Sequence, residues 1–373
     1  MLCREDILKT RDLLLDNLKA LLIFLVVFGH LCDTSLGFIQ DGAYETATAS
    51  FTASDVEIED SVLLELQGNA GHLCRSVFCA IYSFHMPLFL FLAGCTSKNF
   101  IKDRKRVLSR CFSFLFLYIA LKFVIAAVQA AFGNTVSFAL LSESGVPWYA
   151  LAMCLFYLIA YLTRELNQPL VLALFLITAL LCGYDASIGD FLILSRVLVF
   201  YPFFLAGLLC NWESLKKALQ QRWVRWLSLL FLIGFLLFCW FQIDIIYVMR
   251  PLFTGRNSYK SLDDYQQYGF WLRLLSYLIS TAVSLAVISV VPNRSFKFSV
   301  VGSRSLQIYF WHRPIIYMMS YAGVYQLLED LLGAGRARVS IVWMASSFVI
   351  VWLLSFKPIQ KPFQLLFRSS LND

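Results

Sequence analysis

Apolar runs of about twenty residues recur along this sequence, and each run is long enough to cross a bilayer as a helix. They dominate a chain of 373 residues, of which 59% are hydrophobic and 15% are charged. Because backbone polar groups inside a bilayer need internal hydrogen bonds, such a chain folds as a helix bundle. The sequence predicts an all-α, polytopic integral membrane protein. No long polar stretch marks off a second domain, so residues 1–373 are expected to form a single transmembrane domain.

The runs predict about ten spans, centred near residues 23, 86, 119, 156, 176, 200, 235, 279, 310 and 347. Charged residues precede the first run and no small-residue cleavage site follows it, so it is expected to be a retained span. Basic residues gather in alternate connections, which under the positive-inside rule places both termini in the cytoplasm. That orientation requires an even number of spans. The predicted location is the cell membrane.

The longest connection, residues 35–72, carries seven Asp and Glu residues and no Lys or Arg. Its Ser/Thr-rich stretch has little apolar surface to bury, so we expect a partly disordered segment outside the cell. The segment either covers the functional site or merely links two spans.

The remaining composition excludes two classes of function. The net charge of +7 is explained by basic cytoplasmic connections rather than by a basic, aromatic stripe, which argues against nucleic-acid binding. The ten cysteines stand singly in apolar runs, without the spacing of a metal or redox site, so no metal is predicted. Cys32 and Cys74 are the pair expected near the outer surface, and whether they are bonded stays open.

The first apolar run, RDLLLDNLKALLIFLVVFGHLCD, contains a lysine near its start and a histidine near its end. Lys19 and His30 are 11 residues apart, which on a helix is three turns plus about 20° and a rise of roughly 16 Å. Asp12, Asp16 and Asp33 lie within about 60° of the same line. The stripe favours a helix that lines a wet pocket or channel. Alternatively, the two N-terminal aspartates and Lys19 form a cluster that reaches the cytoplasmic surface.

Two further histidines each stand two residues before a proline inside an apolar run, as HMP at His85 and HRP at His312. Each proline leaves a carbonyl one turn earlier without its N–H partner, which predicts a kinked helix with a free acceptor. Such backbone is tolerated beside protein or water. A polar cavity and a pair of core histidines satisfied by neighbouring helices are both compatible with this pattern. Arg196, Arg313 and Lys122 add charge within or near the membrane.

These motifs resemble, in order and over almost the whole chain, the acyltransferase-3 family of polytopic membrane acyltransferases, especially its fucose-4-O-acetylase-like branch. The family's first span has a basic residue, ten intervening residues and a histidine, matched by Lys19 and His30, with Asp16 before them. Further matches are SFHMPLFLFLAG (83–94), KDRKRVLSR (102–110), WYALAMCLF (148–156), RVLVFYPFFLAG (196–207) and VGSRSLQIYFWHRP (301–314). The proline that the family often has after the basic stretch is absent.

The resemblance implies transfer of an acyl group, commonly acetyl from acetyl-CoA, to a hydroxyl of a sugar or lipid-linked glycan. His30 is then the expected general base, because a neutral imidazole with a pKa near 6.5 suits proton abstraction at neutral pH. Helix geometry alone, rather than a family motif, places Asp33 one turn on, where it either orients the ring of His30 or is exposed. Contacts to the substrates are expected from a set of polar residues along the spans: Asp16, Lys19, His85, Arg196, His312 and Arg313.

Arg104, Arg106 and Arg110 are expected to hold the phosphates of the acyl-CoA donor at the cytoplasmic mouth, because guanidinium groups match phosphate oxygens. Topology alone also accounts for a basic inside loop. A transporter or ion-coupled carrier is the alternative function, since carriers too have broken helices and intramembrane histidines. The acceptor, the length of the acyl group and the oligomeric state are not determined by the sequence.

Overall fold

The computed structural model describes residues 12–50, 68–136, 138–142, 145–189, 191–333 and 336–368. These ranges are almost entirely helical and contain no strand, which confirms the all-α prediction. The longer helices are α2 (Leu13–Ser50), α4 (Asn69–Tyr82), α5 (His85–Ser97), α6 (Arg104–Ala131), α7 (Trp148–Thr163), α8 (Gln168–Leu181), α9 (Leu194–Leu209), α10 (Trp212–Leu219), α11 (Arg222–Phe241), α14 (Gly269–Val290), α16 (Ser305–Tyr321), α17 (Val324–Leu332), α18 (Arg336–Leu354) and α19 (Lys357–Arg368). Short elements are η1 (Cys182–Tyr184), α12 (Ile243–Tyr247), α13 (Arg250–Phe253), η2 (Tyr259–Tyr268) and α15 (Ser299–Gly302).

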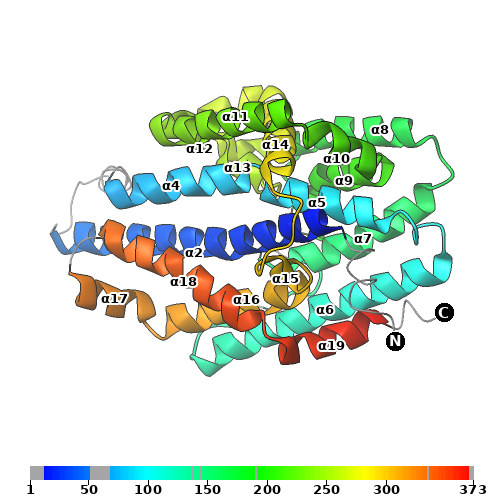
Figure 1. The fold of residues 1–373 in the computed structure, drawn as a ribbon. Coiled ribbons are helices and arrows are strands. Elements are labelled where there is room, and N and C mark those ends of the chain that lie inside the picture. The colour runs from blue at the N-terminus through cyan, green and yellow to red at the C-terminus, as the bar shows by residue number, and fades with distance from the viewer. Residues whose placement is uncertain are drawn as a thin grey trace.

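Helix α2 lies at the centre of the bundle, where it contacts α4, α15, α16 and α18 (Figure 1). Its leucines Leu14, Leu18 and Leu22 are fully buried, since residues four apart share a helix face. The start of α2 is fixed by Asn17, whose amide donates to backbone carbonyls at 292 and 294 at 2.7 and 2.8 Å. The polar residues of α2 are therefore held on a firmly packed element.

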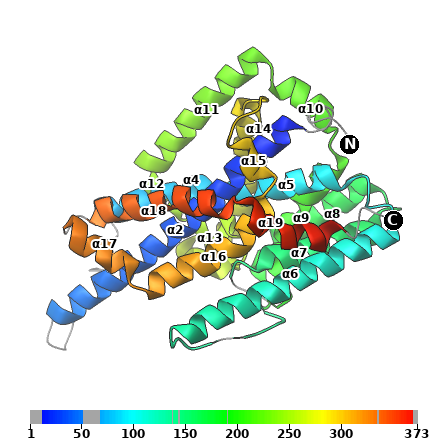
Figure 2. The same ribbon diagram turned by 60° about the horizontal axis from the view of Figure 1, so that its bottom comes forward.

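Six helices in the described part of the chain are long and apolar enough to cross a membrane, or seven if the bent pair α9–α10 is one span. Every residue predicted as the centre of a span lies inside a helix, but α7 and α8 are shorter than these six candidate spans. Helix α11 is exposed along most of its apolar length and projects from the bundle in Figure 2. Such a face is suited to lipid, so the chain is an integral membrane protein.

The predicted connection at 35–72 is partly helical, so its expected start was wrong. Helix α2 continues to Ser50, and α4 already begins at Asn69. The acidic and Ser/Thr-rich composition did not stop the helix, because these residues are only mildly unfavourable in helix interiors. Residues 51–67, which are part of the segment for which disorder was expected, lie outside the described residues.

The break expected in the second span occurs before Pro87 rather than at it. Helix α4 ends at Tyr82 and α5 begins at His85, which puts Pro87 in the first turn of α5, where its missing N–H costs little. The carbonyl of Ser83 at the break accepts a hydrogen bond from the hydroxyl of Ser280 on α14. The freed acceptor is thus satisfied by a neighbouring helix, and the break places His85 at the start of a helix.

Candidate active site

One face of α2 lines a cavity of about 730 Å³ that extends along much of the helix. The lining residues on α2 are spaced three and four apart: Asp16, Lys19, Ile23, Val26, His30 and Asp33. The predicted shared face of Lys19 and His30 is confirmed. We call the part of this cavity around Asp16 and Lys19 the Asp16 end, and the part around Asp33 the Asp33 end.

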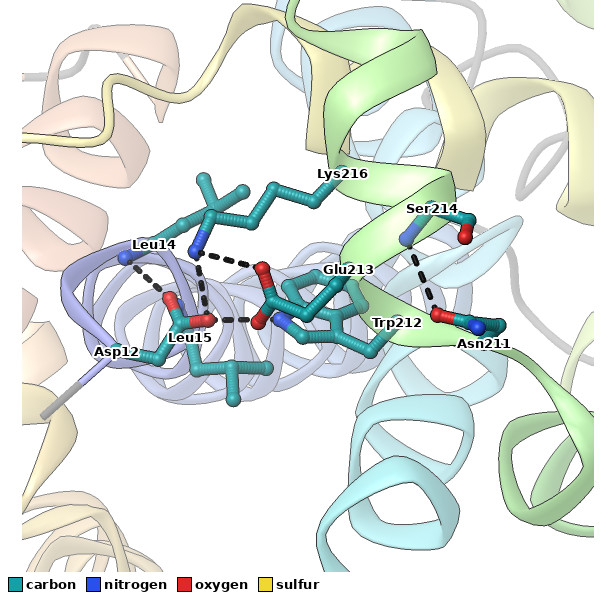
Figure 3. A network of polar contacts seen from close by, with 8 residues as sticks. All are labelled: Asp12, Leu14, Leu15, Asn211, Trp212, Glu213, Ser214 and Lys216. Atoms are coloured by element: carbon teal, nitrogen blue, oxygen red, sulfur yellow. Dashed lines mark hydrogen bonds and ion pairs between the residues drawn. The ribbon is translucent and has the colours of Figure 1, made fainter. Parts of the chain in front are cut away.

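Asp12 does not line the cavity, although the sequence placed it on the stripe. Its carboxylate accepts hydrogen bonds from the indole N–H of Trp212 at 2.7 Å and from Lys216 at 2.9 Å, both on α10 (Figure 3). Burial alone would raise the pKa of the Asp12 carboxyl, but these contacts outweigh it and lower the pKa. Asp12 therefore ties the start of α2 to α10, and its partner is Lys216 rather than Lys19.

Three histidines from three helices meet beside the middle of the cavity. The ring of His30 on α2 lies 5.3 Å from that of His312 on α16, measured between centroids. Tyr82 lies between His30 and His85, with its ring centroid 6.4 Å from that of His30 and 4.8 Å from that of His85. His30 and His85 line the cavity, whereas His312 is fully buried behind His30 and is not among the lining residues. His312 can therefore act on a substrate only through His30.

Backbone carbonyls fix which ring nitrogen carries the proton in two of these histidines. Nδ1 of His85 lies 2.9 Å from the carbonyl oxygen of Ile81, and Nδ1 of His312 lies 2.7 Å from that of Tyr309. A carbonyl only accepts, so Nδ1 is the donor and Nε2 of the neutral ring keeps a lone pair. Nε2 of His312 is buried without a hydrogen-bond partner in the described part of the chain. For His30, Nδ1 lies 3.5 Å from the hydroxyl of Tyr82, which can donate or accept.

Asp33 has a partner other than the expected one. The helix does continue through Asp33, but its carboxylate lies 3.5 Å from the guanidinium of Arg250. The ring of His30 faces Tyr82 instead, so Tyr82 and not Asp33 is placed to orient it. Arg250 also packs over the rings of Phe78 and Tyr247, at 5.1 and 5.6 Å from their centroids. Asp33 therefore belongs to the cavity wall rather than to the histidine cluster.

Of the three arginines expected to bind the donor, Arg110 alone lines the cavity. Its guanidinium lies over the rings of Phe100 and Phe367, at 5.7 and 5.3 Å from their centroids. Arg104 and Arg106 are exposed at the start of α6, and Arg106 pairs at 3.2 Å with Asp103, whose carboxylate caps that helix. The structure therefore separates Arg110, which lines the cavity, from Arg104 and Arg106, which lie outside it. Lys122, also singled out as an intramembrane charge, lies on α6 within 3.4 Å of the carbonyl of Ser142.

The C-terminal helix α19 forms a wall of the Asp16 end, which the sequence did not predict. Gln360, Phe363, Gln364 and Phe367 line the cavity, and α19 lies against α6 and α16 (Figure 1). The carbonyl of Leu366 accepts a hydrogen bond at 2.9 Å from Ser113 of α6. The alternation of apolar and basic residues in KPIQKPFQLLFR was the available signal, because it is typical of a helix at a membrane interface.

Arg196 and Arg313 reach the cavity from α9 and α16, as the sequence predicted for two charges at membrane depth. Arg196 is buried, with its guanidinium 5.0 Å from the ring centroid of Trp148, and Arg313 lies 4.5 Å from that of Tyr317. Arg250, Arg256 and Arg304 also line the cavity and were missed. They lie in the connections between spans or in short helices, and a basic residue in a connection is explained by membrane topology alone.

Cys32 and Cys74 meet, as the sequence allowed, but as free thiols. Cys32 Sγ lies 3.0 Å from the carbonyl oxygen of Cys74, and both residues are fully buried. In the part of the chain that the structure describes, no group of His, Cys, Asp and Glu has the arrangement of a metal site.

A helical membrane bundle that encloses a cavity lined by histidines and arginines has the features of a polytopic membrane enzyme. The family model described as an acyltransferase domain matches residues 12–356, so this chain belongs to the acyltransferase-3 family and is a membrane acyltransferase. The comparisons with curated proteins and with solved structures gave no match to this chain. The match ends immediately before α19, so a wall of the cavity lies beyond the family region.

Proposed function

We propose that this protein transfers an acyl group, with acetyl as the first candidate, from acyl-CoA to a hydroxyl of a sugar or of a lipid-linked cell-envelope glycan. The observation that carries the proposal is the continuity of the cavity, because it joins a basic mouth at Lys19 and Arg110 to the histidines around His30. A soluble thioester donor and a hydroxyl acceptor need such a continuous space. The resemblance to the fucose-4-O-acetylase-like branch supports a sugar acceptor.

His30 takes the role of general base in this proposal. The acceptor oxygen attacks the thioester carbonyl carbon while His30 removes the hydroxyl proton. The carbon–sulfur bond then breaks, and the proton on the imidazolium returns to the leaving CoA thiolate. Arg313, which lines the cavity, takes the role of stabilising the oxyanion in this proposal, and a preorganised donor of this kind typically contributes roughly 10²–10³-fold in rate. His85 donates through Nδ1 to the carbonyl of Ile81, so the lone pair of its Nε2 is available to accept a hydrogen bond from a substrate hydroxyl.

The donor phosphates are assigned to the Asp16 end. Arg110, Lys19 and Arg304 line the cavity there, and Gln360 of α19 reaches Ser303 at 3.4 Å next to Arg304. Lys19 and His30 are separated by a rise of roughly 16 Å along α2, which leaves room for the pantetheine arm between phosphate and thioester. Arg104 and Arg106 lie further out, where they attract the donor without contacting it in the cavity. This arrangement presumes a cytoplasmic Asp16 end, as the positive-inside rule proposes.

The test combines a chemical and a cellular measurement. Purified protein in nanodiscs should release free CoA thiol from acetyl-CoA when an extract of cell-envelope glycans is supplied, and mass spectrometry of these glycans should show acetyl esters that disappear when the gene is deleted. Glycans that are unchanged by the deletion, together with movement of an acceptor across the membrane without CoA release, would establish a carrier instead.

A further inference from the structure

A second cavity, of about 450 Å³, lies against the C-terminal helix α19, and we call it the α19 cavity. Its walls come from α6, α16, α19 and the end of α18. Every described residue on these walls is aliphatic, aromatic or proline, and they include Phe116 and Ala120 of α6, Trp311 and Ile315 of α16, and Pro362 and Leu366 of α19. A space with such walls takes a hydrocarbon group, because a polar ligand would lose its hydrogen bonds to water there without replacement.

The α19 cavity lies at the depth of the hydrocarbon core along α6. Helix α19 meets α6 where the basic residues of α6 end, since the hydroxyl of Ser113, three residues after Arg110, donates at 2.9 Å to the carbonyl of Leu366. No charged residue follows Arg110 on α6 until Lys122. Ala120 is ten residues beyond Arg110, which is a rise of roughly 15 Å along the helix. The cavity therefore extends from α19 towards the interior of the bilayer.

The α19 cavity opens on a surface that is suited to lipid. Phe116 is 61% exposed although it lines the cavity, and Phe112 and Phe123, four residues before it and seven residues after it, are 68% and 60% exposed. This spacing puts the three rings on one face of α6. In an integral membrane protein an apolar face of this kind lies against lipid chains, so the cavity is reached from the bilayer.

Helix α19 has the arrangement of a helix at a membrane surface. Ile359, Phe363 and Leu366 are spaced four and three residues apart, and all three line the α19 cavity. Lys361 is two residues from Ile359 and from Phe363, about 160° around the helix from either, and it is exposed, as is Lys357. The lysines thus lie on the face of α19 opposite the cavity, where they are suited to anionic lipid head groups and water. A membrane phospholipid has both the chain and the head group that this arrangement fits.

Phe363 links the α19 cavity to the candidate active site, because its side chain lines both cavities. Its ring centroid lies 5.4 Å from that of Phe310, another residue of the α19 cavity. We infer that an acyl chain of a phospholipid, from the leaflet at the Asp16 end, occupies the α19 cavity and supports α19 as a wall of the active site. Resting on the proposed function, this inference makes binding of the CoA donor dependent on phospholipid.

Fluorescence of Trp311 tests whether a lipid chain enters the α19 cavity. The full chain is placed in nanodiscs of phosphatidylglycerol, with or without bromine atoms in the middle of the acyl chains, because bromine quenches a tryptophan that it approaches. The chain has nine tryptophans, so the signal of Trp311 is the difference between the protein and Trp311→Phe. This signal should be lost in the brominated lipid. Ala120→Phe fills the cavity with a ring and should restore it, whereas Ala127→Phe, at an exposed position one heptad further along α6, should not.

Binding of CoA tests whether the lipid chain supports the active site. In a steroid detergent, which has no alkyl chain, the Kd of the wild-type protein for CoA should rise about 5-fold or more, the lower range of coupling between two sites. Added phosphatidylglycerol should reverse this rise. Ala120→Phe should keep tight binding without lipid, because its own ring supports α19, and Ala127→Phe should behave like the wild-type protein.

Four results would overturn the inference. No quenching of Trp311 would exclude a chain from the cavity, and equal quenching in Ala120→Phe would show contact with surrounding lipid only. Recovery of the Trp311 signal when palmitoyl-CoA is added would assign the cavity to the chain of a donor. A Kd for CoA that is the same with and without phospholipid would remove the supporting role. Failure of the proposed function is recognised separately, because it abolishes CoA binding in every preparation and leaves the quenching unaffected.

Discussion

Helices α5 and α9 approach so closely that the structure predicts the effect of adding one methyl group between them. A Cβ at Gly207 of α9 would lie 2.0 Å from the carbonyl oxygen of Phe91 on α5, whereas ordinary van der Waals contact begins at 3.4 Å. Gly94 of α5 is in the same position, 2.1 Å from the carbonyl oxygen of Phe204. The obstructing atoms belong to the backbone and cannot rotate away. Gly207→Ala therefore forces the helices apart locally by about 1.4 Å, the difference between 3.4 and 2.0 Å.

The cost of this displacement follows from measured overpacking. Extra methyl groups in a packed core destabilise the folded protein by roughly 1–3 kcal/mol. Replacing glycine by alanine in a helix interior stabilises the helix by roughly 1 kcal/mol, which offsets part of that loss. Gly207→Ala should thus lose up to about 2 kcal/mol of stability. Activity should fall further, because α9 also carries Arg196, and a 1 Å misplacement of a site residue can cost about 10²-fold in rate.

The assay is the half-life of the purified protein in nanodiscs at a fixed elevated temperature, together with CoA release from acetyl-CoA. Gly234→Ala is the matched control, because it makes the same change in helix α11 at a position with nothing within 4 Å. It should be neutral or slightly stabilising. The reasoning is refuted if the Gly207 variant lasts as long as the Gly234 variant and retains full turnover.

Three further predictions concern single side chains. Arg110→Gln should raise the KM for acetyl-CoA about 10-fold with a smaller change in kcat, whereas Arg106→Gln, outside the cavity, should change KM less than about 2-fold; equal effects would contradict the donor assignment. Asp12→Asn should cost about 1 kcal/mol of stability. Because folding lowers the pKa of Asp12, its carboxylate contributes fully to stability above the unfolded pKa of 3.8, and this contribution is lost only as the pH falls through the lower folded pKa. The loss of stability in Asp12→Asn, measured by thermal unfolding, should therefore be equal at about pH 6 and about pH 8. Tyr82→Phe should lower kcat about 10-fold if its hydroxyl orients His30, and an unchanged kcat would remove that role.

The sequence predicted those features that depend on periodicity along one helix. Hydropathy placed each span centre inside a helix, and a separation of 11 residues put Lys19 and His30 on one face, because both signals are local. The same logic placed Asp12 on the stripe, but its position at the end of α2 leaves its carboxylate free to bond with Trp212 and Lys216. Those partners are about two hundred residues away and depend on how α10 packs.

The features that the sequence missed depend on tertiary contacts. Arg250 and Arg256 line the cavity from the segment between α11 and α14, and the packing of that segment is set by distant contacts such as the hydrogen bond from Arg273 to the carbonyl of Leu252. The proline after His85 indicated an irregular second span, although the break lies before it, whereas α16 runs through Pro314 as one helix. The two prolines did not indicate that His312 would be buried behind His30, or that the imidazole Nδ1 atoms would bond to carbonyls of their own spans.

The central claim is that His30 removes the proton from the acceptor hydroxyl. The measurement that tests it most directly is kcat for acetyl transfer by His30→Gln, with the glycan acceptor identified by mass spectrometry and the variant inserted in the same nanodiscs as the wild-type protein. Glutamine keeps the size and hydrogen bonding of the side chain but removes its basicity, so kcat should fall by roughly 10²-fold or more while protein abundance and CoA binding stay nearly unchanged. Turnover near the wild-type rate would contradict the claim, and His85, the other histidine that lines the cavity, would become the candidate base.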